Sequence, residues 1–523
     1  MGTTKEFNMK KIFFYLCVIL GVACIGISLY AGGEKEAATA EPEEIEIEFM
    51  MLEDDAPIAL DSVKWEALRK KTGVKIIQKP HPSAGYEEKF WTLCATNNLP
   101  DLADARGTTP KLAKYARQGV FLEVSQYLDI MPNYKKWLDT KPRLRSGYMD
   151  GKVYNFMQVH AYKVGDVSGR VPIIRKDLMD ETGLGEPETF DDLYRLLKRI
   201  KQLHPQLISW TRRGNLTYTF FNDGMLFNWG TGKQVYYDYD LKEWKFGPIM
   251  PQYRTALQWY RKLYSEGLID PEDTHSSKWI EKWSTGKAAF TWDNGDKILG
   301  FSHTLPENVP GAAVTFLKAV KNPWGQARLL QYADHRTAWC SYVASSKVKY
   351  PEKLVKMFDY MYSEEGMMLT NWGFEGEHYT MVGGKPKLTQ KYVDKYKDAF
   401  SPWRNFQYIE GLGKQSMFTV AMDERVANAW ITPLEVEAKK YWTTLAQQMY
   451  EPAFSEEADE RRTDLISNLK NIFQPMQEKV MAGKADLADW DAAVQQMKKA
   501  GAEELEQMYN DAWAKTEWAR FVE

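Results

Sequence analysis

Apolar and polar residues alternate first at a strand period and then at a helix period in the opening part of the chain. Residues 45–50 (IEIEFM) switch between apolar and acidic side chains, which is the pattern of a half-buried strand. Residues 62–72 carry apolar side chains at helical spacing, and Gly73 ends that segment. A strand at 74–77 and a helix at 86–97 follow. This order predicts a parallel α/β sheet.

The rest of the chain continues the mixed pattern. Strands are expected at 151–157 and 171–175, a hairpin at 236–246, and a buried strand at 288–291. Long helices are expected at 190–203, 254–266, 351–362 and 458–482. Thr189 and Asp192 fit a capping box before the first of these helices, and from residue 487 onward the chain is helical, charged and amphipathic.

The N-terminal segment has the features of an export signal. Lys10 and Lys11 precede an uncharged, mostly apolar run over residues 12–30, which predicts a signal peptide spanning residues 1–31. The same run is at the lower limit of length for a single membrane anchor. We therefore expect an exported protein of the periplasm or cell envelope.

How the N-terminus is processed remains open at this point. Cys24 follows Ala23, the small residue that a lipidation motif needs, but Gly21 stands where that motif prefers Leu. The alternatives are a lipid anchor on Cys24 and cleavage after Ala31. Residues 32–44 are rich in Ala, Glu and Pro and predict a flexible tether.

Composition and charge narrow the class of protein. The 523 residues suggest about three domain-sized units or two large lobes. Acidic and basic side chains nearly cancel (71 against 68), which argues against nucleic-acid binding.

Four Cys exclude a disulfide scaffold, and Cys94 and Cys340 are interpreted as buried thiols, with a bridge as the alternative. Common metal and nucleotide motifs are absent, so no cofactor and no metal are predicted. The 19 Trp and 29 Tyr hint at flat recognition surfaces.

Short motifs in a fixed order resemble one family. They are Leu99-Pro100-Asp101-Leu102, Asp150-Gly151-Lys152-Val153-Tyr154, Tyr264 to Glu272 (YSEGLIDPE), Gly286 to Phe290 (GKAAF) and Gly373 to Tyr379 (GFEGEHY). Together they resemble the extracellular solute-binding proteins of ABC importers, in the large branch of LipO-like and alginate-binding-protein-like members that bind oligosaccharides. Each motif is weak, but their order and spacing run across nearly the whole chain.

The resemblance implies an α/β, two-lobed periplasmic-binding-protein fold (type II-like and large), with a hinge and extra C-terminal helices. Lobe 1 is expected at 45–160 with about 300–345, and lobe 2 at about 161–299 with about 346–523. The implied function is capture of an oligosaccharide by hinge closure and delivery to a membrane permease, with no bond made or broken. The protein is expected to act as a monomer. Many relatives carry a calcium loop after the helix at 190–203, but residues 203–209 contain no carboxylate, so we predict that this site is lost.

Candidate ligand contacts lie where strands end, because binding sites of α/β folds gather there. Trp and Tyr stack on sugar faces, while charged and amide side chains bind hydroxyls. Trp292, Asp293 and Asn294 follow the strand at 288–291 and form the best candidate. The other candidates are Glu53, Asp54, Asp104, Arg106, Gln158, His160, Tyr162, Trp339, Trp372, Glu375 and Trp403. Trp210, Trp229, Trp244 and Trp259 are expected to pack in the core or the hairpin.

Two other functions are consistent with the composition. A secreted glycoside hydrolase or lyase would need two carboxylates at a defined separation, which no motif marks. A surface adhesin or scaffold would lack a specific small ligand. The net negative charge weakly favours a neutral glycan over a uronate polymer.

Overall fold

The computed structural model describes residues 43–515 except for 54–61, 83–84, 106–109, 141–143, 145–147, 150, 163–169, 215, 217–222, 273–277, 333–340, 413–418, 450–451 and 453. The predicted signal peptide, Cys24 and residues 32–42 of the tether lie outside the described residues, as does Cys340. All elements below belong to one compact unit, Ile45–Glu523.

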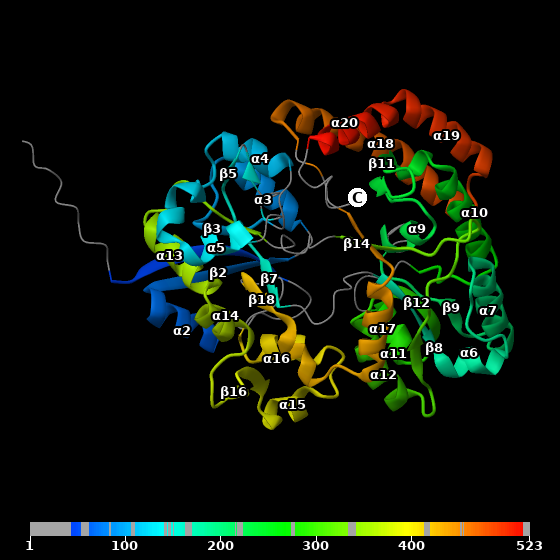
Figure 1. The fold of residues 1–523 in the computed structure, drawn as a ribbon, viewed down its shortest axis with the longest axis horizontal. Coiled ribbons are helices and arrows are strands. Elements are labelled where there is room, and N and C mark those ends of the chain that lie inside the picture. Colours follow the sequence, from blue (N-terminus) through cyan, green and yellow to red (C-terminus); the bar gives the residue numbers. More distant parts are fainter. Residues whose placement is uncertain are drawn as a thin grey trace, which may run out of the picture. The chain divides into compact units, whose positions relative to one another are not determined.

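The first sheet is the parallel α/β sheet that the N-terminal pattern predicts. Its strand order is β2-β1-β3-β15-β6. Strand β1 (Ile45–Glu53) pairs in parallel with β2 (Val74–Pro82) and β3 (Leu102–Asp104). Strand β15 (Ser341–Ala344) pairs antiparallel with β3 and with β6 (Phe156–Met157). Helices α2 (Val63–Thr72) and α3 (Tyr86–Ala95) connect the first three strands (Figure 1).

The second sheet has the order β13-β8-β12-β9. Its strands are β8 (Arg170–Arg175), β9 (Ile208–Trp210), β12 (Ala288–Asn294) and β13 (Val314–Phe316). Strand β12 pairs antiparallel with β8 and parallel with β9. It extends three residues beyond the predicted strand at 288–291, and this extension includes the best candidate residues for the site.

Several locally encoded predictions are confirmed. Helix α7 (Phe190–Leu203) starts at a complete capping box between Thr189 and Asp192. Strands β10 (Val235–Asp238) and β11 (Glu243–Phe246) form the predicted hairpin. Helices α10 (Pro251–Ser265), α13 (Pro351–Tyr362) and α18 (Glu456–Met481) match the predicted segments within a few residues. The single strand expected at 151–157 is wrong, because β5 (Lys152–Val153) and β6 are separate strands with different partners.

The remaining elements complete the chain around these two sheets. Before residue 300 they are α4 (Pro110–Arg117), η1 (Val124–Ile130), α5 (Pro132–Thr140), β4 (Tyr148–Met149), β7 (Val159–Tyr162), α6 (Lys176–Thr182), α9 (Asp223–Asn228), η3 (Gly247–Ile249), α11 (Lys278–Ser284) and α12 (Lys297–Asn308). After it they are β14 (Leu329–Tyr332), α14 (Glu364–Asn371), β16 (Tyr379–Val382), β17 (Lys385–Leu388), α15 (Gln390–Tyr396), α16 (Pro402–Ile409), β18 (Ala421–Asp423), η5 (Glu424–Ala429), α17 (Pro433–Thr443), β19 (Ala446–Met449), α19 (Leu487–Lys499) and α20 (Ala502–Ala514).

The C-terminal helices are structural parts of the second sheet's core. Figure 1 shows α18, α19 and α20 beside α10 and the β10–β11 hairpin. Trp490, Tyr509 and Trp513 belong to the same buried cluster as Trp210, Trp229 and Trp244. The interpretation of these last three tryptophans as core residues is confirmed, and partly buried Trp259 packs against the same cluster.

Two segments that the sequence analysis assigned to one lobe pack with the sheet of the other. Strand β13, within the span 300–345 given to lobe 1, pairs with β8 in the second sheet. Helix α13, given to lobe 2, contributes Leu354, Met357 and Phe358 to the buried cluster of the first sheet. The position of the hinge stays a prediction.

Candidate functional site

One edge of the second sheet gathers charged side chains from segments far apart in sequence. Strands β12 and β9 run parallel with Phe290 opposite Trp210, so their following residues emerge at the same edge. Three residues beyond each of these partners, the Arg213 guanidinium donates to Asp293 Oδ1 at 2.7 Å. The Asn294 backbone N–H donates to the same carboxylate at 2.7 Å. Asp293 is fully buried, whereas the Arg213 side chain is 26% exposed. Arg213 is therefore the group of this pair that a solute can reach.

The structure does not place Trp292 at a ligand surface. Successive side chains of a strand point to opposite faces, so Trp292 and Asp293 cannot both face the same side once β12 extends through them. Trp292 is 0% exposed, stacks on Phe190 with ring centroids 6.3 Å apart, and donates its indole N–H to the Arg170 carbonyl at 3.0 Å. Its geometry is that of a core residue.

A second set of charges continues from the end of β12. Asp296 Oδ2 accepts from Lys297 Nζ at 3.1 Å and lies 3.2 Å from Arg404 Nη2 at the start of α16. Burial alone would raise the pKa of Asp296, but the Lys297 ammonium and the Arg404 guanidinium outweigh it, and the pKa lies well below its ordinary value. Nearby, burial raises the pKa of Glu435, which pairs with Lys439 at 2.8 Å.

This electrostatic arrangement predicts a pH-dependent effect of Asp296→Asn. A carboxyl group with a lowered folded-state pKa contributes stability above its unfolded pKa of about 3.9, and the contribution is lost as the pH falls toward the folded-state pKa. We expect the variant to be less stable than the wild type by about 1 kcal/mol at pH 7, a modest value because the side chain is partly exposed. Urea unfolding at pH 7, 5, 4 and 3 checks this: the difference should be constant down to about pH 4 and shrink below it. A difference that grows with acidification contradicts the assignment.

Several polar atoms of this cluster are buried without a hydrogen-bond partner among the described residues. They are Asp293 Oδ2, Asp296 Oδ1, Glu435 Oε2 and Arg404 Nε. A buried polar atom without a partner costs about 1–3 kcal/mol, so native proteins rarely keep several of them together. The cluster can therefore accept further hydrogen bonds at three carboxylate oxygens and donate one from a guanidinium.

The first sheet also collects candidates along one edge. Tyr342 of β15 lies opposite Asp104 and opposite Phe156, so the ends of β3 and β6 meet there. The Tyr86 hydroxyl lies within hydrogen-bond distance of the backbone carbonyls of Asp104 and Met50, at 2.9 and 3.1 Å, and so joins β1 to β3. Asp104 is buried, and so is Gln158, whose amide donates to the Thr419 carbonyl at 2.7 Å. Both side chains are therefore buried beneath this edge of the first sheet.

Trp372 and Trp403 lie in a separate buried cluster that includes Phe406 and Trp430. Trp372 is buried and donates its indole N–H to Asp423 Oδ2 at 2.7 Å. Arg425 binds the same carboxylate through Nε and Nη2 at 2.9 and 2.6 Å. The ring of Trp403 is partly buried and lies 5.1 Å from the guanidinium carbon of its neighbour Arg404. Trp372 is thus a structural residue, and Trp403 keeps a partly open face beside the charged cluster.

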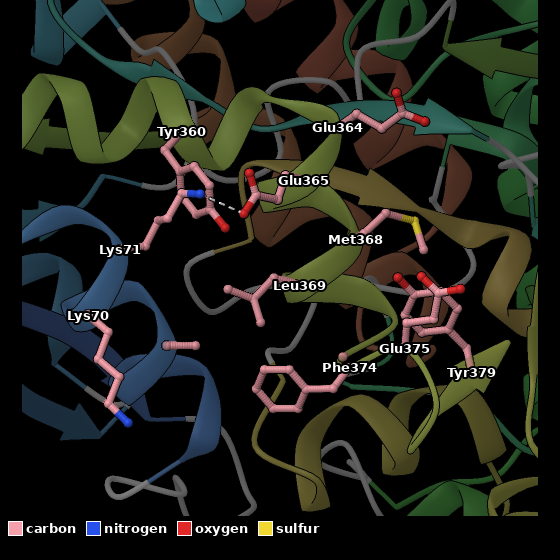
Figure 2. A pocket seen from close by; sticks show the side chains of 12 residues that line it. Lys70, Lys71, Tyr360, Glu364, Glu365, Met368, Leu369, Phe374, Glu375 and Tyr379 are labelled. Carbon is pink, nitrogen blue, oxygen red and sulfur yellow. Dashed lines mark hydrogen bonds and ion pairs between the residues drawn. The ribbon is translucent and has the colours of Figure 1, made fainter. Parts of the chain in front are cut away.

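Glu375 lines a cavity away from both sheet edges. The cavity has a volume of about 500 Å³ and lies between α2, α13, α14 and the turn at 373–379 (Figure 2). The structure therefore does not bring Glu375 together with Asp293, although the sequence grouped them as ligand contacts.

Other candidates cannot be placed. Asp54, Arg106 and Trp339 lie outside the described residues. Glu53, His160 and Tyr162 belong to β1 and β7, but their side chains are not described. They remain predictions from the sequence.

Sequence reasoning missed Arg213, Arg404 and Glu435. Arg213 follows the three-residue strand β9, and its partner Asp293 is 80 residues away in the sequence. A weak signal exists, since Thr211-Arg212-Arg213 follows the apolar end of a strand just as Asp293 does. Nothing local marks Arg404 or Glu435.

Among the described residues, no group of three or more His, Cys, Asp and Glu side chains is arranged to hold a metal ion. In the same part of the chain, no helix combines the length and apolar character needed to cross a bilayer.

Comparison with known proteins decides the family. Residues 55–368 match the model of the bacterial extracellular solute-binding protein family. The chain belongs to this family. The family prediction is confirmed, and members are binding proteins, which supports a function in binding over a function in catalysis.

Individual relatives of this solute-binding protein agree in length and fold. Lipoprotein LipO of Bacillus subtilis is 25% identical over 494 residues, covering 90% of this chain and 92% of its own. The alginate-binding protein AlgQ2, crystallised without calcium ion, superposes with a TM-score of 0.77 at 20% identity over 90% of this chain and 98% of its own. The S. pneumoniae ABC-transporter substrate-binding protein FusA, in complex with kestose, gives a TM-score of 0.71 at 19% identity over 90% and 99%. The predicted two-lobed α/β fold with added C-terminal helices is confirmed.

Proposed function

We propose that the protein is the solute-binding component of an ABC importer and that its solute is an oligosaccharide. FusA was solved with kestose, and AlgQ2 is named as an alginate-binding protein, so two proteins of this fold bind sugars. The observation in this chain that carries the proposal is the group of four unpartnered polar atoms on Asp293, Asp296, Glu435 and Arg404. Sugar hydroxyls both donate and accept hydrogen bonds and can satisfy all four.

The chemistry of these atoms favours a neutral glycan. Three of the four are carboxylate oxygens, which need donors, and a hydroxyl supplies a donor. A uronate carboxylate would bring another acceptor, which these three oxygens cannot satisfy. The atoms are enclosed in this structure, so a hydroxyl reaches them once a partly exposed side chain, Arg213 or Arg404, moves aside.

The proposed mechanism is closure of two lobes on the solute. We assign lobe 1 to the elements around the first sheet, including α13 and α14, and lobe 2 to the elements around the second sheet, including β13 and α18–α20. A solute that contacts both lobes stabilises the closed state by its differential contacts and shifts the equilibrium toward it. The closed form then delivers the solute to a permease, and no covalent step occurs.

Anchoring to the membrane through a lipid on Cys24 is part of the proposal. The relative LipO is named as a lipoprotein. A tethered binding protein stays near its permease, which raises the effective concentration of the pair. A monomer suffices for this cycle.

Isothermal titration calorimetry with matched oligosaccharides tests the proposed function. Neutral fructo- and gluco-oligosaccharides and charged oligouronates are titrated into wild type, Arg213→Ala and the control Arg461→Ala. Arg461 lies on α18, and its guanidinium pairs with Glu504 of α20. We expect neutral ligands to bind tighter than uronates, and Arg213→Ala to weaken binding at least tenfold because a charge-assisted hydrogen bond is lost. Arg461→Ala should bind as the wild type does.

Three results would contradict this proposal. One is the absence of heat with every glycan, which would favour a scaffold. Another is the appearance of cleavage products, which would indicate a carbohydrate-active enzyme. Equal affinities of the Arg213→Ala and Arg461→Ala variants would show that the edge of the second sheet at Arg213 is not part of the glycan-binding site.

A further inference from the structure

Another cavity lies on the outer flank of the second sheet, where α7, α10 and the turn at 322–326 supply most of its lining. Its volume is about 580 Å³, which is in the range of small-molecule sites. Figure 1 shows α7 and α10 beyond β9. Phe190, which lines the cavity at the start of α7, stacks on Trp292 with ring centroids 6.3 Å apart. Because Trp292 and Asp293 point to opposite faces of the sheet, the cavity lies on the face that Asp293 does not reach.

Three aromatic rings form one wall of this cavity. The Phe190 and Trp229 rings stack with centroids 4.0 Å apart, and Trp259 lies edge-on to Phe190 at 5.3 Å. Phe190 and Trp229 are 2% and 1% exposed, whereas Trp259 is only partly buried, so Trp259 presents most of the accessible ring surface. A flat apolar ring fits the C–H face of a sugar ring. Since the two buried rings hold Trp259 in place, little conformational entropy is lost when a ligand packs on it.

The polar side chains that line the cavity are of mixed chemistry. The Asp191 carboxylate accepts hydrogen bonds, the Arg261 guanidinium donates them, and the Gln258 amide does both. None of the three forms a hydrogen bond or ion pair with another residue in the part of the chain that the structure describes. Hydroxyl groups also donate and accept, so a polyol can use all three side chains.

The charges around the cavity nearly balance, which disfavours an ionic ligand. Lys262 lines the cavity with Arg261 but lies over the Tyr194 ring, 3.7 Å from its centroid. The pKa of Asp486 is held low by backbone N–H groups and, more weakly, by Arg261, so Asp486 and Asp191 oppose the two basic groups. An anion meets two carboxylates and a cation meets two basic groups, whereas a neutral sugar meets neither penalty.

An exposed tryptophan beside the cavity is a second, independent sign of a ligand. Trp324 is 49% exposed and follows Pro323, which lines the cavity. The turn that carries it is fixed from within, because the Asn322 side-chain oxygen accepts the backbone N–H groups of Trp324 and Gln326, both at 3.0 Å. The Gln326 amide in turn donates to Asp240 at 2.6 Å. An aromatic ring held half in water on a preorganised turn suits stacking on a ligand.

We propose that this cavity is a second saccharide-binding site, which holds a unit of a neutral glycan independently of the sheet edge at Asp293. One sugar ring packs its C–H face on Trp259, and its hydroxyls bond with Asp191, Gln258 and Arg261. The next unit of the chain reaches the Trp324 ring. The site lies on one sheet alone, so binding needs no movement of the lobes. A glycan chain held here stays at high local concentration near the sheet edge.

Ligand-observed nuclear magnetic resonance titration of the full chain tests this inference. Methyl glucoside, maltotriose and kestose are the neutral probes, and trigalacturonate is the charged one. They are added to wild type, Arg213→Ala and the double variant Asp191→Ala/Gln258→Ala, which changes two exposed side chains of the cavity. The matched control is Asp398→Ala/Gln495→Ala, the same pair of changes at exposed positions of other helices and turns.

We expect the neutral trisaccharides to bind at millimolar concentration. The double variant of the cavity should weaken this binding about three- to tenfold, because two hydrogen-bonding groups are lost. Trp324→Ala should weaken the trisaccharides but not methyl glucoside, which occupies one ring position only. Trigalacturonate should bind more weakly than maltotriose, and the control variant should bind as the wild type does.

The inference is overturned if the neutral trisaccharides show no millimolar binding to Arg213→Ala, if the double variant of the cavity binds them as the control does, or if trigalacturonate binds as well as maltotriose. It stands apart from the proposed function of the sheet edge. Arg213→Ala should leave the millimolar binding unchanged, and Asp191→Ala/Gln258→Ala should leave tighter binding at the sheet edge unchanged, so either proposal can fail alone.

Discussion

Replacing Trp292 by alanine should lower the free energy of unfolding by about 3–5 kcal/mol. The side chain is 0% exposed, packs against Phe190 and Phe290, and donates its indole N–H to the Arg170 carbonyl. Its removal leaves a large cavity in the core of the second sheet and a backbone acceptor without its partner. Denaturant unfolding measures the effect through a lower midpoint.

A matched control separates the effect of losing a buried tryptophan from the effect of losing any tryptophan. Trp324 is 49% exposed, and Trp324→Ala should change stability by no more than about 0.5 kcal/mol. A Trp292→Ala protein that unfolds like the wild type but no longer binds glycan would reverse the assignment. Trp292 would then be the ligand-stacking residue that its position near a strand end first suggests.

Replacing Asp423 by alanine should cost about 2–4 kcal/mol. The fully buried carboxylate accepts the Trp372 indole N–H at 2.7 Å, the Arg425 backbone N–H at 3.0 Å and two guanidinium nitrogens of Arg425. Alanine leaves these donors without an acceptor in the interior, although Arg425 is partly exposed and can turn to water. Denaturant unfolding should show the lower stability.

The control for Asp423→Ala is Asp398→Ala, because Asp398 is exposed and its one ion pair among the described residues is with the exposed Lys397. That variant should be within about 0.5 kcal/mol of the wild type. If Asp423→Ala were equally mild, the contacts of Asp423 with Trp372 and Arg425 would contribute little to holding β18 against the end of α14.

The parts of the fold that sequence reasoning predicted are those encoded over a few residues. The alternation in residues 45–50, the capping box at Thr189 and the turn between β10 and β11 depend on neighbours in the chain. The extent of β12 was not predictable in this way. Whether the strand ends at Thr291 or at Asn294 depends on pairing with β8, over 100 residues earlier.

The candidate site was predictable only in part for the same reason. Asp293 was found because it lies near a strand end, but the alternation of strand side chains makes it and Trp292 face opposite ways. Arg213 contacts Asp293, and Arg404 and Glu435 interact with Asp296, through tertiary contacts that leave no local pattern in the sequence. Trp372 and Glu375, only three residues apart, separate into a core position and a cavity wall.

The place of β15 in the first sheet has a consequence for the biosynthesis of the protein. This strand separates β3 from β6, yet it is made more than 180 residues after β6. Until residue 344 has left the ribosome, and later the export machinery, β3 has a bare edge that can pair with another chain. Truncated products that end before β15 should therefore be prone to aggregation, and neither half of the molecule can be obtained by cutting the chain once.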